Sequence, residues 1–347
     1  MKLRRKLAQA IAIAAIGIMS VTTSFASELP VLTLEQAISS ALSADAAQQE
    51  AYTADRAAAS QIMQDTDDVA TTAYQSNYYN RLESEQTEKY HKDAVTYEAT
   101  KLYNSIALLE KQVAFCDEKL VLQEKQFSQA ELKYRNGLIS KIQYETAEST
   151  IKEQRTAKDK LQAELDKNRA DFKLLAKYDT SRYTLEGNFD VEYYEYTGNI
   201  QYFFNTSVNE MLQYQEKLVE VSENYSVTDA LKRRDNSAVT YYNSKSSTAQ
   251  AKVQLKSMKE QYLSSLNTLY SSLETTKQNI KELEVKVQDL EKTLEANKLK
   301  LEKGLISQIE VDEAELDLKE LQLNLLAYKV QYNATKDAVK KPWVNFY

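Results

Sequence analysis

The chain has 347 residues, of which 43% are hydrophobic and 27% are charged, and it contains only five glycines and two prolines. Both prolines, Pro30 and Pro342, lie near its ends, so almost nothing in between interrupts a helix, and the composition predicts long helices or coiled coils. The net charge of −7 excludes the basic surface that a nucleic-acid-binding protein needs, and we expect no nucleic-acid partner.

Residues 1–26 have the pattern of a secretory signal peptide. A basic start is followed by an apolar stretch from Leu7 to Met19 and by small residues before a cleavage point after Ala26. The apolar stretch is short for a membrane span. Cleavage would leave 40 basic against 51 acidic residues, a net charge of −11. We therefore expect an exported protein of the extracytoplasmic cell envelope.

A first helical repeat is predicted over residues 27–178. Thr33 caps an Ala-rich helix that runs to about Gln64. Residues 65–80 are polar and fit either helix or loop, and a continuous helix follows from about Arg81 to Asn136. Its apolar residues follow the 4-3 spacing of a coiled-coil seam: Leu102, Ile106, Leu109, Val113, Cys116, Leu120, Phe127, Ala130 and Tyr134.

The sequence Gly-Leu-Ile-Ser ends this helix and occurs again later in the chain. The two copies are Gly137, Leu138, Ile139 and Ser140, and Gly304, Leu305, Ile306 and Ser307. Glycine supplies the left-handed residue that ends one helix, and serine caps the next in a capping box with Gln143 or Glu310. Each copy is therefore predicted to be the tip of a helical hairpin.

Residues 179–198 differ from the helical sequence on both sides. The alternating apolar residues from Tyr183 to Tyr193 give the strongest strand signal of the chain. A single strand leaves its edges unpaired, so we expect an extended linker segment that pairs with a neighbouring subunit.

A second helical repeat is predicted over residues 199–347. It comprises a helix to about Tyr225, a cap region at 226–229, a long arm ending at Lys303 and a last helix ended by Pro342. The two tips are 167 residues apart, and the same offset aligns the seams of the two arms, so the halves are a duplication. The last helix carries one seam at Ile309, Leu316, Leu323 and Val330 and another at Val311, Ala314, Leu318, Leu321, Leu325, Tyr328 and Tyr332. Two seams predict neighbours on both sides.

Catalytic chemistry is not indicated. Cys116 and His91 are the only residues of their types, and no metal-binding spacing or phosphate-binding loop is present. Cys116 also falls on the predicted seam, where it serves as apolar filling. We expect a protein that is not an enzyme and has no cofactor and no metal.

An exported chain that opens Leu32-Thr-Leu-Glu-Gln-Ala-Ile38, with hairpins tipped Tyr134-Arg-Asn-Gly-Leu-Ile-Ser140 and Glu302-Lys-Gly-Leu-Ile-Ser307, resembles the TolC family of outer-membrane efflux proteins. The resemblance implies an all-α protomer of long antiparallel coiled-coil hairpins that contributes to a trimeric α-helical tunnel. It also implies that the tips meet a periplasmic adaptor, or membrane fusion protein, linked to an inner-membrane pump.

The resemblance further implies a pore entrance lined by acidic residues one turn beyond the second tip, at Glu310 and Glu313. Glu310 has an alternative role in the capping box. The family inserts a strand pair in each repeat, but neither residues 65–80 nor residues 229–247 supply two strands of 9–11 alternating residues. We therefore expect little or no β-barrel.

Two functions remain. The first is an exported component of an efflux or secretion system that forms an oligomeric helical conduit and docks an adaptor through its tips. The alternative is a coiled-coil structural or scaffold protein of the cell envelope with no transport role.

Overall fold

The computed structural model describes residues 29–66, 69, 71–232 and 237–346. The chain divides into two units, residues 1–30 and 31–347. The predicted signal peptide lies outside the described residues. Residues 31–347 form the helical unit described below.

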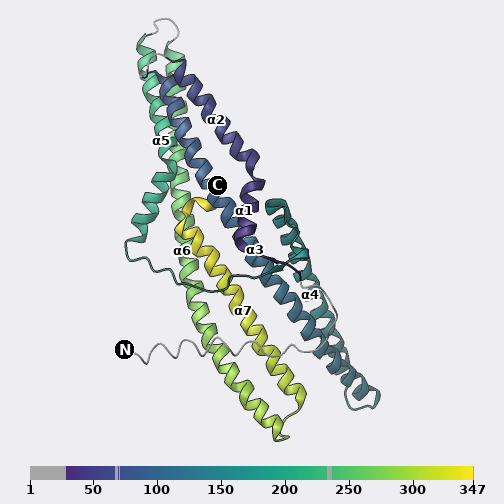
Figure 1. The fold of residues 1–347 in the computed structure, drawn as a ribbon. Coiled ribbons are helices and arrows are strands. Elements are labelled where there is room, and N and C mark those ends of the chain that lie inside the picture. Colours follow the sequence, from purple (N-terminus) through teal and green to yellow (C-terminus); the bar gives the residue numbers. More distant parts are fainter. Residues whose placement is uncertain (1–28, 67–68, 70, 233–236, 347) are drawn as a thin grey trace, which may run out of the picture. The chain divides into compact units, whose positions relative to one another are not determined.

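Each half of this unit contains a long helical hairpin, as the seams predict (Figure 1). The first half comprises β1 (Val31–Leu32), α1 (Leu34–Ala44), α2 (Ala46–Gln64), α3 (Thr72–Arg135), α4 (Lys141–Ala176), a 3₁₀ turn (Thr180–Arg182) and β2 (Thr184–Leu185). The second half comprises α5 (Ile200–Lys232), α6 (Ser237–Glu302), α7 (Gln308–Lys340) and a 3₁₀ turn (Pro342–Asn345). The all-α prediction is confirmed.

Three predicted boundaries were wrong. The first helix is not continuous to Gln64, because the chain turns at Asp45 and begins a new helix, α2. The helix α3 begins at Thr72, capped by the Thr71 side chain, so most of residues 65–80 is helical. The helix α5 continues to Lys232, through the expected cap region at 226–229.

The hairpins lie side by side because α7 contacts both α6 and α3. The seam of α7 that contains Val311 and Leu318 packs on α6. On the other side, Glu320 pairs with Lys119 of α3 at 2.7 Å, and Lys319 pairs with Glu118 at 2.5 Å. These charged positions flank the row of Ile309, Leu316, Leu323 and Val330, so that row faces α3. The two seams therefore find both neighbours within one chain.

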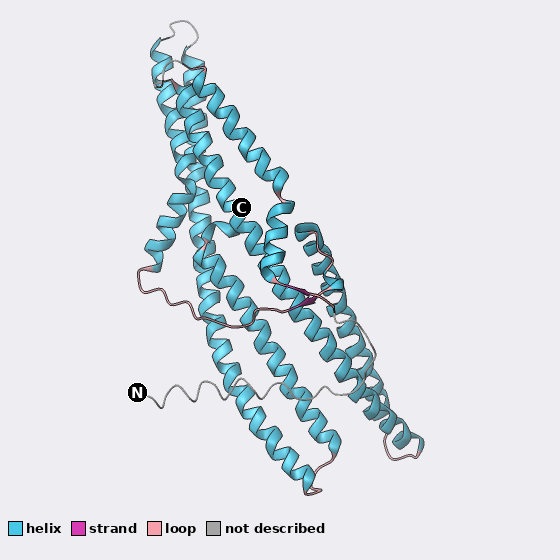
Figure 2. Cartoon of the chain, in the orientation of Figure 1, coloured by secondary structure: helices cyan, strands magenta, loops and turns pink. Residues whose placement is uncertain are grey.

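The strand signal of the linker is satisfied inside the chain. β2 pairs in parallel with β1, with Val31 opposite Thr184 and Leu32 opposite Leu185 (Figure 2). The expected pairing with a neighbouring subunit is therefore wrong. Sequence periodicity shows that a segment is extended but not which distant segment it meets.

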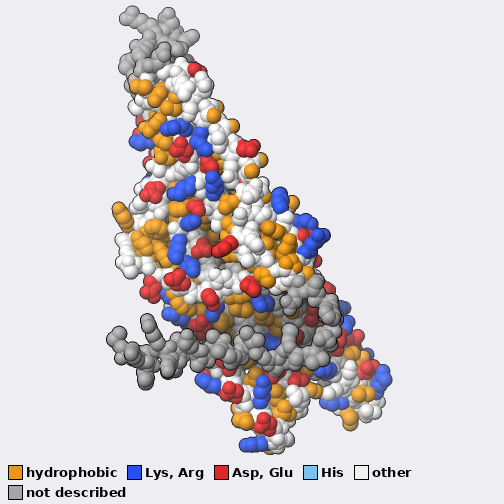
Figure 3. All heavy atoms as spheres, in the orientation of Figure 1, with side chains coloured by type: hydrophobic (Ala, Val, Ile, Leu, Met, Phe, Trp, Pro, Cys, Tyr) orange, Lys and Arg blue, Asp and Glu red, His pale blue; other side chains and the backbone are white. Residues whose placement is uncertain are grey.

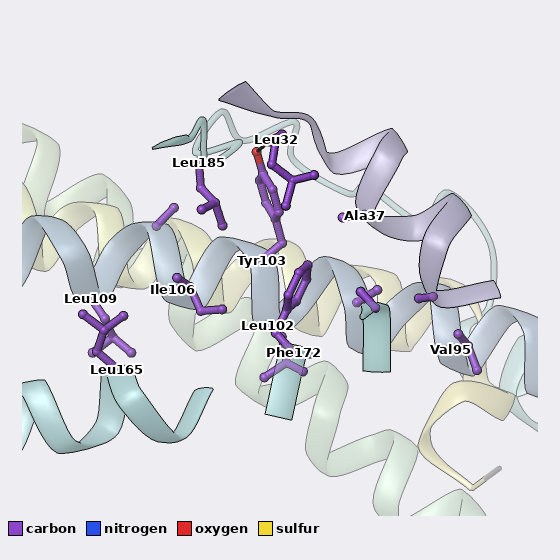
Figure 4. Close-up of a cluster of buried hydrophobic side chains, with 14 residues drawn as sticks. Leu32, Ala37, Val95, Leu102, Tyr103, Ile106, Leu109, Leu165, Phe172 and Leu185 are labelled. Atoms are coloured by element: carbon purple, nitrogen blue, oxygen red, sulfur yellow. Dashed lines mark hydrogen bonds between the residues drawn. The ribbon is translucent and has the colours of Figure 1, made fainter. Parts of the chain in front are cut away.

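The side chain of Tyr103 on α3 holds β1 and the residue after β2 together through hydrogen bonds. Its fully buried hydroxyl donates to the Leu32 carbonyl at 2.6 Å and accepts from the Glu186 amide at 3.1 Å. Figure 4 shows Tyr103 beside Leu32, within an apolar cluster that also contains Phe172 and Leu185. One α3 side chain thus joins the start of the unit to its linker.

The C-terminal turn closes the second half against the first. Trp343 stacks on Tyr90 of α3 with ring centroids 4.8 Å apart, and its indole N–H donates to Asp93 at 2.8 Å. Phe346 stacks on Tyr262 of α6 at 3.9 Å. The predicted helix stop at Pro342 is confirmed.

Candidate functional site: the hairpin tips

The backbones of the two tips are nearly identical. Gly137 and Gly304 both have φ +69°, the left-handed conformation that glycine adopts without strain. In the first tip, the amide of Leu138 donates to the Lys133 carbonyl at 2.8 Å. The amide of Leu305 donates to the Lys300 carbonyl at 2.9 Å in the second. Together with the glycine amides, these bonds form the Schellman ending of a helix.

The returning helices begin with the predicted capping boxes. The Ser140 hydroxyl accepts from the Gln143 amide at 3.3 Å, and the Gln143 side chain accepts from the Ser140 amide at 2.8 Å. In the second tip, a Glu310 carboxylate oxygen accepts from the Ser307 amide at 2.7 Å. The hydrogen bonds that hold each reversal thus involve no side chain of the two apolar residues between glycine and serine.

Those apolar residues divide into a packed one and an exposed one. Ile139 and Ile306 are half-buried, and Ile306 packs against the apolar cluster between α6 and α7. Leu138 and Leu305 are 72% and 69% exposed. Exposing a leucine contributes nothing to the reversal, so these two side chains are free to contact a partner.

The periodicity did not single out a second pair of exposed leucines. Leu132 and Leu299 lie shortly before the tips, off the seam, and are 60% and 58% exposed. They are separated by the same 167 residues as the tips. The sequence signal for this pair is the repeat itself, because a leucine outside the seam recurs at the same 167-residue offset. Ile142 of the first tip is also exposed, whereas its counterpart Ile309 is half-buried.

The acidic residues of the second tip each have a partner within the chain. Glu310 accepts hydrogen bonds from the amide and hydroxyl of Ser307, which hold the pKa of its carboxyl below the usual range. Glu313 accepts from the Gln126 side chain of α3 at 2.5 Å. Both residues are exposed, but their contacts serve the cap and the α3–α7 packing.

Both tips lie at the same end of the helical unit, where α3 meets α4 and α6 meets α7 (Figure 1). Figure 3 shows apolar and charged side chains mixed over the visible surface, including the ends of the hairpins. The surface at this end therefore combines exposed leucines with lysine and glutamate side chains.

Cys116 is buried, and burial raises the pKa of its thiol, which disfavours the reactive thiolate. Among the described residues, no three His, Cys, Asp or Glu side chains gather as a metal site would require.

Comparison with known proteins decides the fold. No family model matches the chain, and no curated protein matches it in sequence. Solved structures do match. The outer-membrane channel OprN superposes with a TM-score of 0.64 at 11% identity, covering 89% of each chain. This is the TolC-like fold.

Two further channels match over most of their length. One is CusC, whose structures concern folding and transmembrane channel formation. It superposes with a TM-score of 0.62 at 12% identity, and the match covers 94% of this chain and 95% of the CusC chain. The outer-membrane channel MtrE of Neisseria gonorrhoeae gives 0.56 at 10% identity, covering 90% and 88%. The TolC-like fold of this chain thus extends over both repeats.

In the part of the chain that the structure describes, no helix combines the length and the apolar character needed to cross a bilayer.

Proposed function

We propose that this chain is an exported component of an efflux or secretion system. Three copies form a helical conduit, and the hairpin tips dock a periplasmic adaptor of the membrane fusion type, which links them to an inner-membrane pump. Glu310 and Glu313 lie at the entrance of the conduit. The TolC-like fold supports this proposal, since its solved neighbours are outer-membrane channels and not enzymes.

The observation that carries the docking site is the pair of exposed leucines at equivalent positions in both tips. Leu138 and Leu305 contribute their backbone amides to the reversals, but their side chains are exposed and take no part in them. Leu132 and Leu299 extend each apolar surface along its arm. Repeated exposed leucines beside charged side chains are suited to an amphipathic helical partner such as an adaptor hairpin.

The arrangement of α4 supports an oligomer. This helix packs on α3 and α1 through residues such as Ile151, Leu165 and Phe172. Leu174, near its C-terminal end, is 72% exposed. A helix packed on one side only can contribute to a closed tunnel when another copy covers its outer face.

The tips are tested by changing Leu138 and Leu305 to Asp in the mature protein, keeping both glycines. We expect unchanged helical content and loss of adaptor capture, measured in cells with a photo-crosslinking residue at Leu132. The matched control is Val253→Asp, which introduces the same acidic side chain at an equally exposed apolar residue of α6 outside the tips. Equal capture by the tip variant and the wild type would reject the docking site.

A coiled-coil scaffold of the cell envelope is the alternative, and the mass of the purified mature protein separates the two functions. The conduit requires a trimer. A monomer that captures no adaptor would favour the scaffold.

A further inference from the structure

Helix α2 is weakly anchored by apolar contacts. Ala59 is its single buried residue. A cavity of about 420 Å³ separates part of α2 from α3, with Tyr52, Asp55 and Ile62 on one side and Asn77 and Glu83 on the other. Elements with little apolar burial open at low free energy, so polar contacts decide how firmly α2 lies on α3.

Three polar contacts join α2 and the turn before it to α3. Arg56 pairs with Glu88, and the Ser84 hydroxyl donates to the Tyr52 carbonyl at 3.2 Å. At the start of α2, the His91 Nε2 atom lies 2.9 Å from a carboxylate oxygen of Asp45. Both of these atoms are hidden from solvent, and neither completes a hydrogen bond in this geometry. The contact between them therefore depends on charge.

Asp45 is also the residue at which the chain turns. Its amide donates the last hydrogen bond of α1 to the Ala41 carbonyl at 3.2 Å. Its carboxylate accepts no capping hydrogen bond from α2. An aspartate before a helix ordinarily caps that helix. Here the side chain points to α3 instead, so the pair holds the joint between the two helices.

The second repeat has apolar residues at the two positions that correspond to Asp45 and His91. At the 167-residue offset, Ala37 and Ala41 correspond to Phe204 and Val208, and all four are fully buried, so the register is sound here. Asp45 then corresponds to Leu212, and His91 to Met258. Leu212 is buried, and Met258 packs against the same apolar cluster.

The consequence is visible in the helices themselves. Helix α5 runs without interruption past Leu212, whereas its counterpart breaks at Asp45. Two residues of an apolar cluster in the second repeat thus correspond to an ionisable pair at a helix break in the first.

We propose that His91 and Asp45 form a proton-operated latch on α2. Protonated His91 attracts the Asp45 carboxylate and holds the start of α2 on α3. Loss of the proton removes that attraction, and the start of α2 separates from α3 more readily, while the Arg56–Glu88 pair still joins the middle of the helix to α3. Histidine is the side chain whose charge ordinarily changes between pH 5 and pH 8.

The other ionisable groups near the latch are already engaged. The Tyr52 ring of α2 lies 5.9 Å from the His91 ring. One turn earlier on α3, Glu88 is held by Arg56 and by Lys92, the latter at 2.7 Å. Asp93, which follows on α3, pairs with Lys341 of the C-terminal segment at 2.6 Å. Asp45 is the carboxylate left to respond to His91.

The test is amide hydrogen exchange of the full mature protein at pH 5.5 and pH 8.0, corrected for the intrinsic exchange rate. We expect protection at the start of α2 to fall roughly two- to fivefold at the higher pH, the scale of a partly exposed ion pair. Protection of α1 and α5 should stay constant. His91 is the single histidine of the chain, so no other imidazole contributes.

Two variants isolate the pair. In His91→Gln, α2 should be weakly protected at both pH values. The double variant Asp45→Leu with His91→Met copies the second repeat and should protect α2 strongly at both.

Three results would overturn the latch: constant α2 protection in the wild type, a pH-dependent fall that survives in His91→Gln, or an equal fall in α1 and α5. If the double variant does not fold, the wild type and His91→Gln still decide the question.

Discussion

Removing the Tyr103 hydroxyl should weaken the joint between the strands and α3. Tyr103→Phe keeps the ring in its buried cluster but deletes the bonds to the Leu32 carbonyl and the Glu186 amide. Two buried hydrogen bonds at roughly 1 ± 0.5 kcal/mol each predict a loss of about 1–3 kcal/mol in the free energy of unfolding. Urea unfolding followed by far-ultraviolet circular dichroism measures this loss as a lower midpoint at unchanged slope.

The duplication supplies the control for this prediction. Tyr270 occupies the position equivalent to Tyr103, and its hydroxyl makes no hydrogen bond to any described residue, although its ring lies 6.2 Å from that of Phe204. Tyr270→Phe should therefore change the free energy of unfolding by less than about 0.5 kcal/mol. Equal effects of the two substitutions would refute the role assigned to the Tyr103 hydroxyl.

Two further predictions concern a half-buried carboxyl and the glycines of the tips. Burial raises the pKa of Asp337, so the folded state binds its proton more tightly and loses stability as the pH rises through the folded pKa. Asp337→Asn should therefore raise the melting temperature at pH 8 but leave it unchanged at pH 4. The control Asp317→Asn, at an exposed site on the same helix, should leave the melting temperature unchanged at both pH values. Equal melting temperatures of Asp337→Asn and the wild type at pH 8 would contradict this prediction. Gly137→Ala and Gly304→Ala should each cost about 1 kcal/mol in the free energy of unfolding, because alanine at φ +69° is strained although its methyl group meets no neighbour. Thermal unfolding of each variant checks this, and a neutral effect at either tip would show that the left-handed turn is not required.

Features set by neighbouring residues could be read from the sequence. The capping residues Thr33, Ser140 and Ser307 and the two left-handed glycines depend on contacts within one or two turns, and all are confirmed. The coiled-coil seams were equally visible, because an apolar row must face a neighbour. The fold class followed from these local rules.

Features set by distant residues could not be read in the same way. The break at Asp45 involves His91, far along the chain, and an aspartate inside an Ala-rich segment gives no local sign of it. The partner of β2 is likewise chosen by the fold and fixed by Tyr103. At the tips, the sequence predicted the backbone but not which apolar side chain packs and which is exposed.

The β1–β2 pairing has a consequence for the order in which the chain assembles. Its strands and Tyr103 all precede residue 186, so a chain that emerges from its amino terminus can close the first repeat before the second is present. Closing so long a loop costs little more entropy than closing a shorter one. The second repeat, by contrast, ends by placing Trp343 and Lys341 on Asp93 of the first. The contacts that close the first half therefore lie within it, whereas the closing contacts of the second half are made with the first.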